Sequence, residues 1–216
     1  MNGGRRGVQA LRRTPRWTKI LLMARTESTM VGLGTVAPPF ELTDVVTGRA
    51  VGRDDLVALF ASADGRGLLV MFICVHCPYV KHVEQELARI GADYEGKLAI
   101  AAISANDVAN HPEDSPEKMK AQAQRLGFRF PYLYDETQEV AREYSAACTP
   151  DFFLFDRDLK LAYRGQLDSS RPPRDGGPAI PVTGADLRAA IDAVLAGKRP
   201  DTNQRASIGC NIKWRE

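Results

Sequence analysis

The sequence lacks the features that identify several common classes of protein. Its 216 residues contain four cysteines, too few for a disulfide-stabilised scaffold, and no apolar run of 18 residues that could cross a membrane. The segment Gly32-Leu33-Gly34 has neither a preceding strand nor the third glycine of a dinucleotide-binding loop. We therefore expect no membrane partner and no cofactor. With 44% hydrophobic and 26% charged residues, the composition is that of an ordinary globular domain.

Acidic residues are missing from the first 26 positions, which carry seven basic groups. Residues 27–216 hold 22 basic and 27 acidic residues, a formal net charge of −5. Because nucleic-acid binding favours a basic folded surface, we expect no nucleic-acid partner. We also expect a cytoplasmic protein. Residues 1–31 are interpreted as a basic leader, which could be an organelle transit peptide, an export signal or an over-long start ahead of Met23 or Met30. We favour the over-long start.

Hydrophobic periodicity predicts a mixed sheet covered by helices. Strands are expected at residues 40–44, 50–51, 68–75, 98–104, 132–134, 152–155 and 159–163, and helices at 78–96, 115–127, 135–144 and 183–197. The apolar strands at 68–75 and 98–104 flank a helix, which implies a parallel crossover, and the last two strands imply an antiparallel hairpin. Loops are expected at 57–67 and 169–182, and an irregular tail at 198–216.

The most informative motif is Cys74-Val75-His76-Cys77, where an apolar strand stops and Pro78 begins a helical pattern. A helix N-terminus stabilises a thiolate through its unpaired N–H groups and the positive end of its dipole. We expect Cys74, with an exposed sulfur, to be the nucleophile and the more buried Cys77 to be the resolving thiol. The imidazolium of His76 is expected to lower the pKa of Cys74. The motif therefore predicts a redox-active dithiol.

The other two cysteines stand alone. Cys148 precedes Thr149-Pro150, where the residues by themselves favour a trans-proline loop with an inert buried thiol over a cis peptide bond. Cys210 lies in a polar tail and is interpreted either as a spare exposed thiol or as a mobile resolving cysteine that reaches the dithiol. Both are possible auxiliary thiols.

Metal binding is the rival interpretation of the dithiol. Structural zinc sites usually have a second close pair of cysteines, and here the other thiols are isolated, so we predict no metal site. Covalent haem attachment requires C-x-x-C-H, and residue 78 is proline. His82 and His111 are expected to be solvated or to have ordinary partners, and the acids of residues 113–117 to form a solvated helix start.

These motifs together resemble the thioredoxin-like superfamily and, within it, the peroxiredoxin-like branch related to alkyl hydroperoxide reductase and thiol-specific antioxidant proteins. The resemblance covers roughly residues 32–216 and rests on segments 37–42, 72–80, 104–107, 130–135, 148–156 and 207–214. It implies an α/β thioredoxin-like fold, with a central mixed sheet flanked by helices and an N-terminal β extension. It also implies that Thr149-Pro150 is a cis-proline loop that faces the dithiol and pairs with an extended substrate segment.

The chain departs from both relatives at the motif itself. Thioredoxins carry Gly-Pro between the cysteines, whereas Val75-His76 is closer to the oxidising disulfide catalysts. Peroxiredoxins carry Pro-x-x-x-Thr-x-x-Cys, and alignment on Cys77 places Cys74 at the threonine and Val70 at the proline. The resemblance therefore leaves open whether peroxide or a disulfide is the substrate.

The leading hypothesis is a thiol-disulfide oxidoreductase built on a redoxin domain of residues 32–197, followed by a tail of residues 198–216 that carries Cys210. It would act on protein or small-molecule disulfides with a thiol reductant. A thiol-dependent peroxidase with antioxidant activity and a non-enzymatic metal-binding module are the alternatives. The candidate residues are Cys74, Cys77 and His76 for catalysis, Thr149 and Pro150 for substrate binding, and Cys148 and Cys210 as auxiliary thiols.

Overall fold

The computed structural model describes residues 25–61, 67–173 and 180–215. Its helices and strands are β1 Arg25–Glu27, β2 Glu41–Asp44, β3 Ala50–Gly52, α1 Arg53–Ala61, β4 Gly67–Phe72, α2 Pro78–Asp93, β5 Ala99–Ser104, the 3-10 helix η2 Pro112–Asp114, α3 Pro116–Leu126, β6 Tyr132–Tyr134, α4 Glu139–Glu143, β7 Cys148–Thr149, β8 Asp151–Asp156, β9 Leu161–Gly165, α5 Ala185–Leu195 and β10 Ile208–Asn211. No described helix is long and apolar enough to cross a membrane.

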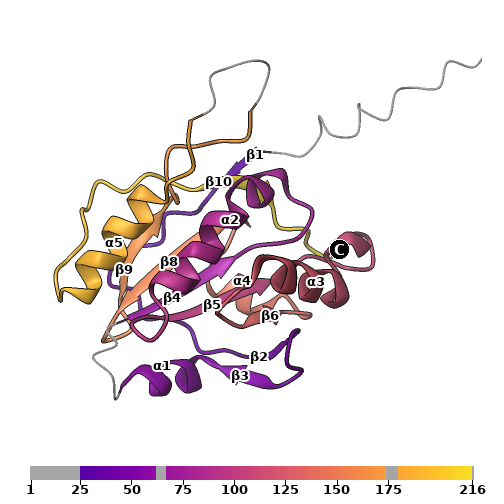
Figure 1. Ribbon diagram of the computed structural model, residues 1–216, viewed down its shortest axis with the longest axis horizontal. Coiled ribbons are helices and arrows are strands. Elements are labelled where there is room, and N and C mark those ends of the chain that lie inside the picture. The colour runs from indigo at the N-terminus through magenta and orange to yellow at the C-terminus, as the bar shows by residue number, and fades with distance from the viewer. Residues whose placement is uncertain (1–24, 62–66, 174–179, 216) are drawn as a thin grey trace, which may run out of the picture.

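The larger sheet has seven strands in the order β3-β2-β6-β5-β4-β8-β9. Strands β4, β5 and β6 run parallel to one another, and the remaining neighbours are antiparallel. The sheet is therefore mixed, and the crossover from β4 through α2 to β5 and the hairpin of β8 and β9 confirm the predicted connections. Figure 1 shows α2 and α5 in front of the strands β4 and β8.

The central strand β4 is buried on both faces because helices cover both sides of the sheet. Its residues alternate between two apolar clusters, as successive side chains of a strand must. Leu69 and Met71 pack on the side that includes apolar residues of α2, α3 and α5. Leu68 and Val70 pack on the other side, with residues of α1 and α4. This double cover explains why β4 reads as a continuous apolar run.

A second, three-stranded sheet joins distant parts of the chain in the order β1-β10-β7. In Figure 1, β1 and β10 lie side by side at the end of the molecule opposite β2 and β3. The prediction of an irregular tail at 198–216 is therefore wrong for β10, and β1 lies inside the segment interpreted as a leader. Residues 1–24 of that segment lie outside the described residues.

Helix ends show which local signals the sequence carried. Ser115 caps α3, accepting a hydrogen bond from the N–H of Lys118, and Gly127 ends the helix with a left-handed φ of 66°, as predicted. The loop predicted at 57–67 is wrong at its start, since α1 continues to residue 61. This helix has Asp54 and Asp55 in its first turn, acidic residues that favour a helix N-terminus.

Two helices begin later than the predicted ranges 135–144 and 183–197. The N-cap of α4 is Gln138, with a left-handed φ of 64°, and not Asp135, whose carboxylate accepts the N–H of Ala141 instead. The N-cap of α5 is Gly184, and Asp168, from the segment after β9, accepts the N–H groups of Thr183 and Gly184 at 2.7 Å each. At α5 a partner from an earlier segment, Asp168, thus bonds the backbone at the start of the helix.

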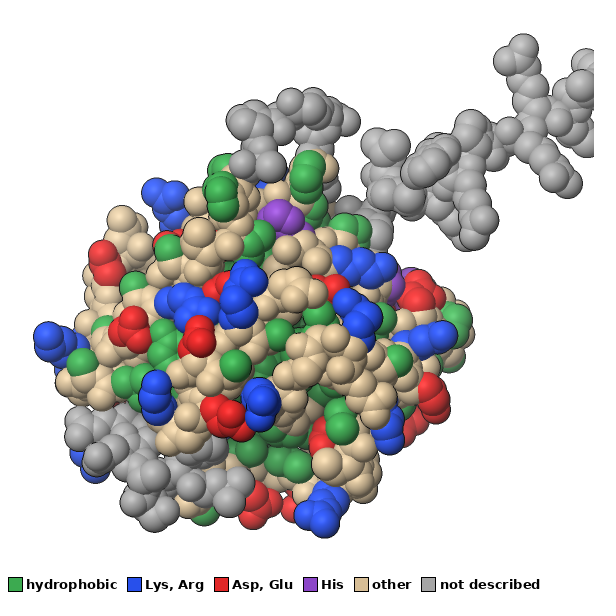
Figure 2. All heavy atoms as spheres, in the orientation of Figure 1, with side chains coloured by type: hydrophobic (Ala, Val, Ile, Leu, Met, Phe, Trp, Pro, Cys, Tyr) green, Lys and Arg blue, Asp and Glu red, His purple; other side chains and the backbone are tan. Residues whose placement is uncertain are grey.

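The surface over these elements carries mixed charge. Figure 2 shows acidic and basic side chains interspersed on the face that presents α2 and α5. Several of them pair across elements, as Arg188 of α5 does with Glu86 of α2 at 2.6 Å.

Candidate active site

The dithiol lies at the junction between β4 and α2. Cys74 follows the strand, and Cys77 is the N-cap residue of α2, with Pro78 in the first helical position. The side chains of both cysteines are buried, with 1% of Cys74 and 0% of Cys77 exposed. The expectation of an exposed Cys74 sulfur is therefore wrong.

The loop predicted to bind substrate meets both sulfurs. The peptide bond between Thr149 and Pro150 is cis. Cys74 Sγ lies 3.2 Å from Thr149 Oγ1, and Cys77 Sγ lies 3.2 Å from the carbonyl oxygen of Thr149. Cys74 and Thr149, 75 positions apart in the chain, thus form a buried contact. The trans peptide bond that the residues by themselves favoured is wrong, because the bond is cis.

The tail brings a third thiol to this site. In β10, Cys210 pairs with Thr149 of β7, and its Sγ lies 2.8 Å from Cys77 Sγ. Cys210 is 2% exposed, so the interpretation as a spare exposed thiol is wrong. A Cβ atom at Gly209 would overlap the carbonyl oxygen of Thr149, so the strand needs glycine there to approach β7.

Cys148 lies in the same pair of strands but has different neighbours. It pairs with Asn211, and its Sγ lies 3.7 Å from the carbonyl oxygen of Pro150. Burial raises the pKa of Cys148 well above its usual value, which keeps the thiol protonated. The sulfur contacts described for the dithiol thus involve Cys210 and not Cys148.

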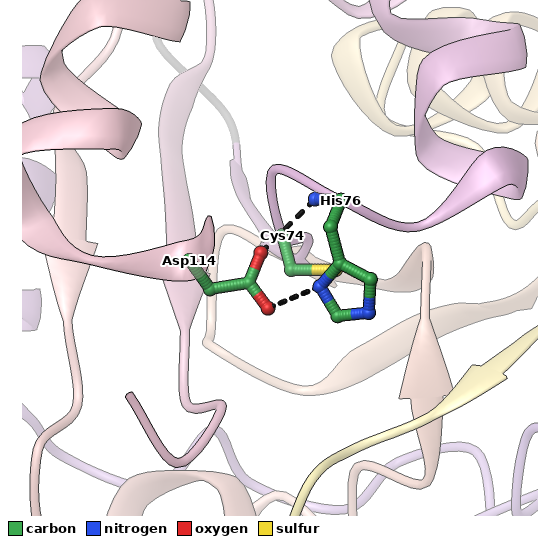
Figure 3. Close-up of side chains that lie close together, drawn as sticks. All are labelled: Cys74, His76 and Asp114. Atoms are coloured by element: carbon green, nitrogen blue, oxygen red, sulfur yellow. Dashed lines mark hydrogen bonds and ion pairs between the residues drawn. The ribbon is translucent and has the colours of Figure 1, made fainter. Parts of the chain in front are cut away.

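Sequence reasoning missed the acidic residue of the site. Asp114, in η2, is fully buried, and its Oδ2 lies 2.5 Å from Nδ1 of His76. Its Oδ1 accepts the backbone N–H groups of Val75 and His76, at 2.8 and 3.0 Å. Figure 3 shows the carboxylate facing the imidazole, with Cys74 beside them. The prediction that the acids of 113–117 form a solvated helix start is therefore wrong for Asp114.

Asn106 links this carboxylate to the tail. Its Nδ2 donates to Asp114 Oδ2 at 2.7 Å, and its Oδ1 accepts the N–H of Lys213 at 2.9 Å. Asn106 belongs to a segment, 104–107, on which the resemblance rested, and this was the one sequence signal near the network. The sequence held no comparable signal for Asp114, because only the fold brings η2 to the motif.

The imidazole of His76 and the carboxylate of Asp114 stabilise each other's charged forms. Burial disfavours the charged imidazole, but the hydrogen bond and the charge of Asp114 outweigh burial and raise the pKa of His76. Burial likewise opposes the ionised carboxylate, but the bonds from His76 and Asn106 lower the pKa of Asp114. His76 also stacks on His111, with ring centroids 5.6 Å apart and planes at 5°.

The pKa values of the two thiols of the motif are shifted in opposite directions. Burial opposes the thiolate of Cys77, but S–H groups of Cys210 and Cys74 and backbone N–H groups of Val80 and Cys210 outweigh it and lower the pKa of Cys77. The carbonyl oxygen of Thr149, which can accept a hydrogen bond from Cys77 Sγ at 3.2 Å, favours the protonated thiol. Burial and the neighbouring Cys77 raise the pKa of Cys74.

This pattern corrects one premise taken from the sequence. The N–H groups next to Cys74, those of Val75 and His76, donate to Asp114 and are not directed to the sulfur. The helix instead favours charge on Cys77, its N-cap residue, through the N–H of Val80 acting at longer range than a regular cap hydrogen bond. The site can therefore hold a buried thiolate at Cys77 beside a protonated Cys74.

The residues that could bind a metal ion are not the pair that the metal-binding hypothesis used. Among the described residues, donor atoms of Cys74, His76 and Asp114 lie within 4.8 Å of one another, as do those of His76, His111 and Glu113. Cys77 belongs to neither group, whereas the rival hypothesis used Cys74 with Cys77. In the first group, Nδ1 of His76 and the Asp114 carboxylate already bind each other.

A buried ion pair holds the cis-proline loop in place. Arg164 of β9 is fully buried and pairs with Asp151, which follows Pro150; Nη2 of Arg164 lies 2.9 Å from Asp151 Oδ2. The guanidinium carbon also lies 3.8 Å from the ring centroid of Phe153. Asp151 accepts the N–H of Ala147 at 3.2 Å, so the pair fixes both ends of β7. The sequence had given no basis for assigning this arginine.

Known proteins of similar sequence and fold place the chain in a family. The sequence model of the AhpC/TSA family matches residues 33–164. A thiol-disulfide oxidoreductase, ResA, from Geobacillus thermodenitrificans is 28% identical over 138 residues, which are 63% of this chain and 70% of ResA.

Solved structures of similar fold include two that superpose on most of this chain. An uncharacterized conserved protein from Geobacillus kaustophilus superposes with a TM-score of 0.82 and 54% identity over 89% of this chain and 97% of that one. A thiol:disulfide interchange protein of the thioredoxin family from Chlorobium tepidum TLS superposes with a TM-score of 0.54 over 76% of this chain and 99% of that one. At 15% identity, the second likeness shows the fold alone. The chain has a thioredoxin-like fold and belongs to the AhpC/TSA family.

Proposed function

We propose that the protein is a thiol-disulfide oxidoreductase that uses the Cys74/Cys77 dithiol. One observation carries the proposal: at the N-terminus of α2, the two thiols lie against Thr149 and have pKa values shifted in opposite directions. A dithiol with one thiolate and one protonated thiol can both attack a disulfide and release the product. The similarity to ResA supports the same reaction class.

The charge distribution assigns the roles. The Cys77 thiolate attacks one sulfur of a substrate disulfide, forming a mixed disulfide and releasing the other substrate sulfur as a thiolate, which takes up a proton. Cys74, after losing its proton, attacks Cys77 Sγ and releases the second substrate thiolate. The dithiol ends oxidised and the substrate reduced, with two electrons transferred. This assignment reverses the order expected from the sequence, which made Cys74 the nucleophile.

His76 acts on the thiolate through its charge. The negative charge of Cys77 contributes to raising the pKa of His76, and the same attraction stabilises the thiolate in return. Asp114 holds Nδ1 of the ring at 2.5 Å and keeps the imidazole protonated. His76 is therefore proposed as a positioning and charge-stabilising residue, supported by Asp114.

The experiment compares serine variants in the dithiothreitol-driven reduction of insulin disulfides. Cys74→Ser and Cys77→Ser are expected to lose the acceleration, whereas Cys148→Ser is expected to keep it. To find the attacking thiol, Cys74→Ser/Cys210→Ser and Cys77→Ser/Cys210→Ser are mixed with oxidised glutathione. The first should accumulate a glutathione adduct on Cys77. A Cys77→Ser variant that reduces insulin at the parental rate would contradict the proposal.

Peroxide reduction is the second candidate, favoured by the lowered pKa of Cys77 at the N-cap of α2 and by the family match. Here the Cys77 thiolate attacks the peroxide O–O bond, giving a sulfenic acid and releasing water or an alcohol. A second thiol then condenses with the sulfenic acid and releases water. Stopped-flow mixing with hydrogen peroxide tests this; oxidation of Cys77 no faster than that of free cysteine would exclude it.

A further inference from the structure

The edge of β7 at which a substrate strand would pair is occupied by another strand of the same chain. The strand β10 pairs antiparallel with β7 and places Cys210 opposite Thr149. A substrate sulfur that approached the Cys77 thiolate along this edge would come to the position that Cys210 Sγ now holds, 2.8 Å from Cys77 Sγ. The tail thus presents a thiol as a substrate would.

We propose that Cys210 is a third redox-active thiol, which exchanges with the Cys74–Cys77 disulfide to form a Cys77–Cys210 disulfide. The proposal rests on the proposed function, since the dithiol must first be oxidised by a substrate disulfide. It assigns a catalytic role to the C-terminal strand, which lies beyond the residues matched by the family model.

The two sulfurs are already in contact. Their separation of 2.8 Å compares with about 2.05 Å for an S–S bond, so bond formation needs a movement of less than an ångström. Both side chains are buried, which keeps competing thiols away. In the reduced protein the two strands therefore already hold the sulfurs close enough for a disulfide to form with a small movement.

The strand is held on both sides of Cys210. Before it, Ser207 Oγ donates to the carbonyl oxygen of Pro150 at 2.7 Å. After it, the N–H of Lys213 donates to Asn106 Oδ1 at 2.9 Å, and Nε2 of Gln138 donates to the Lys213 carbonyl oxygen at 2.8 Å. Such anchoring holds Cys210 Sγ at Cys77 without cost at the moment of reaction.

The step balances within the chain. Cys210 loses its proton, its thiolate attacks Cys77 Sγ, the Cys74–Cys77 bond breaks, and Cys74 leaves as a thiolate that takes the proton. One disulfide is exchanged for another, so no outside oxidant or reductant is consumed.

Charge explains why this step follows oxidation. In the reduced protein, the hydrogen bond to Cys77, burial and the Cys77 charge raise the pKa of Cys210, while Lys213 lowers it. Once Cys77 is in a disulfide, its negative charge is gone and the influence of Lys213 remains. Cys210 then ionises more easily, at the stage when its thiolate is needed.

Trypsin makes the test direct, because the cysteines fall in three peptides. Cys74 and Cys77 share the peptide of residues 67–81, Cys148 is in 143–157, and Cys210 is in 206–213. The full chain is equilibrated with oxidised and reduced glutathione, quenched with acid, alkylated, digested and analysed by mass spectrometry. A Cys74–Cys77 disulfide leaves 67–81 alone and two mass units lighter, whereas the proposed disulfide joins 67–81 to 206–213.

We expect the joined peptides as the main oxidised form of the wild type, with Cys74 as the alkylated residue in 67–81. Cys210→Ser should shift the oxidised protein to the internal disulfide, and the matched Cys148→Ser control should leave the wild-type pattern unchanged. Circular dichroism of each variant checks folding, and the wild-type map needs no variant.

Two results would overturn the proposal in distinguishable ways. If the wild type shows the internal disulfide and no joined peptides at any glutathione ratio, Cys210 is not a redox thiol and the proposed function stands. If neither disulfide forms while the protein stays folded, the proposed function fails as well. Joined peptides that contain Cys148 would show that the wrong thiol was assigned.

Discussion

Cys148 and Cys210 are both buried, both lie in the small sheet, and they occupy adjacent positions along the β7–β10 pairing, yet they face different chemistry. Cys210 is opposite Thr149 and meets Cys77, whereas Cys148 is opposite Asn211 and lies against the carbonyl oxygen of Pro150. Residue type and burial are the same. The two cysteines differ in their position along the strand pairing, by one residue.

That step matters because side chains of a strand alternate between its faces, and directly opposed residues share a face. Thr149 and Cys210 share the face of the dithiol, and Cys148 and Asn211 share the other. A shift of β10 by one residue would place Gly209 or Asn211 opposite Thr149 and turn Cys210 to the other face. The register of β10, held by the glycine that touches Thr149, therefore decides whether Cys210 faces the dithiol.

The largest contrast is expected in the titration of thiolate absorbance at 240 nm. The lowered pKa of Cys77 predicts a thiolate that persists well below the ordinary cysteine pKa of about 8.5. Cys77→Ser should remove this absorbance entirely at neutral pH, and Cys148→Ser should not change it, because burial keeps Cys148 protonated. Absorbance that survives in Cys77→Ser would place the charge on another thiol.

The register is broken by Gly209→Ala, whose Cβ would overlap the Thr149 carbonyl oxygen. We expect a loss of about 1–3 kcal/mol in the free energy of unfolding, the usual cost of overpacking, measured by urea denaturation. The Cys77–Cys210 disulfide should also disappear from the peptide map. Gly32→Ala is the matched control, since a Cβ there meets no atom within 4 Å.

Asp114→Asn tests whether the negative charge of the Asp114 carboxylate stabilises the motif and the imidazolium of His76. Leaving the N–H groups of Val75 and His76 with a poorer acceptor should cost about 1–2 kcal/mol, within the range for a damaged buried hydrogen bond. The pKa of His76 should fall toward its ordinary value, which NMR titration of the imidazole measures.

The pH dependence of this cost follows from the two shifted groups. The raised pKa of His76 gives stability that is present below its unfolded pKa of about 6.5 and is lost as pH rises through the folded value. The lowered pKa of Asp114 gives stability that is present above about pH 4 and is lost as pH falls through the folded value. The difference between wild type and Asp114→Asn should therefore be greatest between these limits. A difference that grows above pH 7 would contradict the pairing.

The smallest effect is expected for Cys148→Ala. It removes one buried sulfur and should cost about 1 kcal/mol, comparable to one buried methylene, with insulin reduction unchanged. Urea denaturation and the insulin assay measure both. A large loss of activity at unchanged stability would show that the two lone cysteines are not as different as the register implies.

The sequence carried the parts of the fold that depend on local pattern. The apolar runs of β4 and β5, the helix after Pro78 and the Ser115 and Gly127 caps follow from neighbours in the chain, and each is confirmed. Strand β10 was missed because Ile208-Gly209-Cys210-Asn211 is too short and polar to show a pattern; it is a strand only because β1 and β7 flank it.

The candidate site likewise has parts that depend on local sequence and parts that depend on long-range packing. The motif and the loop before Pro150 could be named from the sequence, whereas the contacts that set their charge could not. Asp114 is 40 residues beyond Cys74 and reaches it only through the packing of η2. The pKa shifts of the two thiols depend on Val80, Cys210 and Asp114, contacts that the position of each cysteine in the motif does not show, and the attack by Cys77 rather than Cys74 stays a proposal.

The position of β10 between β1 and β7 makes exposure of Cys77 a cooperative event. The tail cannot leave Cys77 without giving up its ladder to β7, and its ladder to β1 ties residues 25–27 to the same motion. Opening of the site is then a local unfolding reaction of two chain segments that are far apart in sequence. Native-state hydrogen exchange should show the amides of 25–27 and 208–211 opening together, at a free energy below that of the central sheet. Under the proposed function, this opening equilibrium would limit the rate at which a large substrate is reduced.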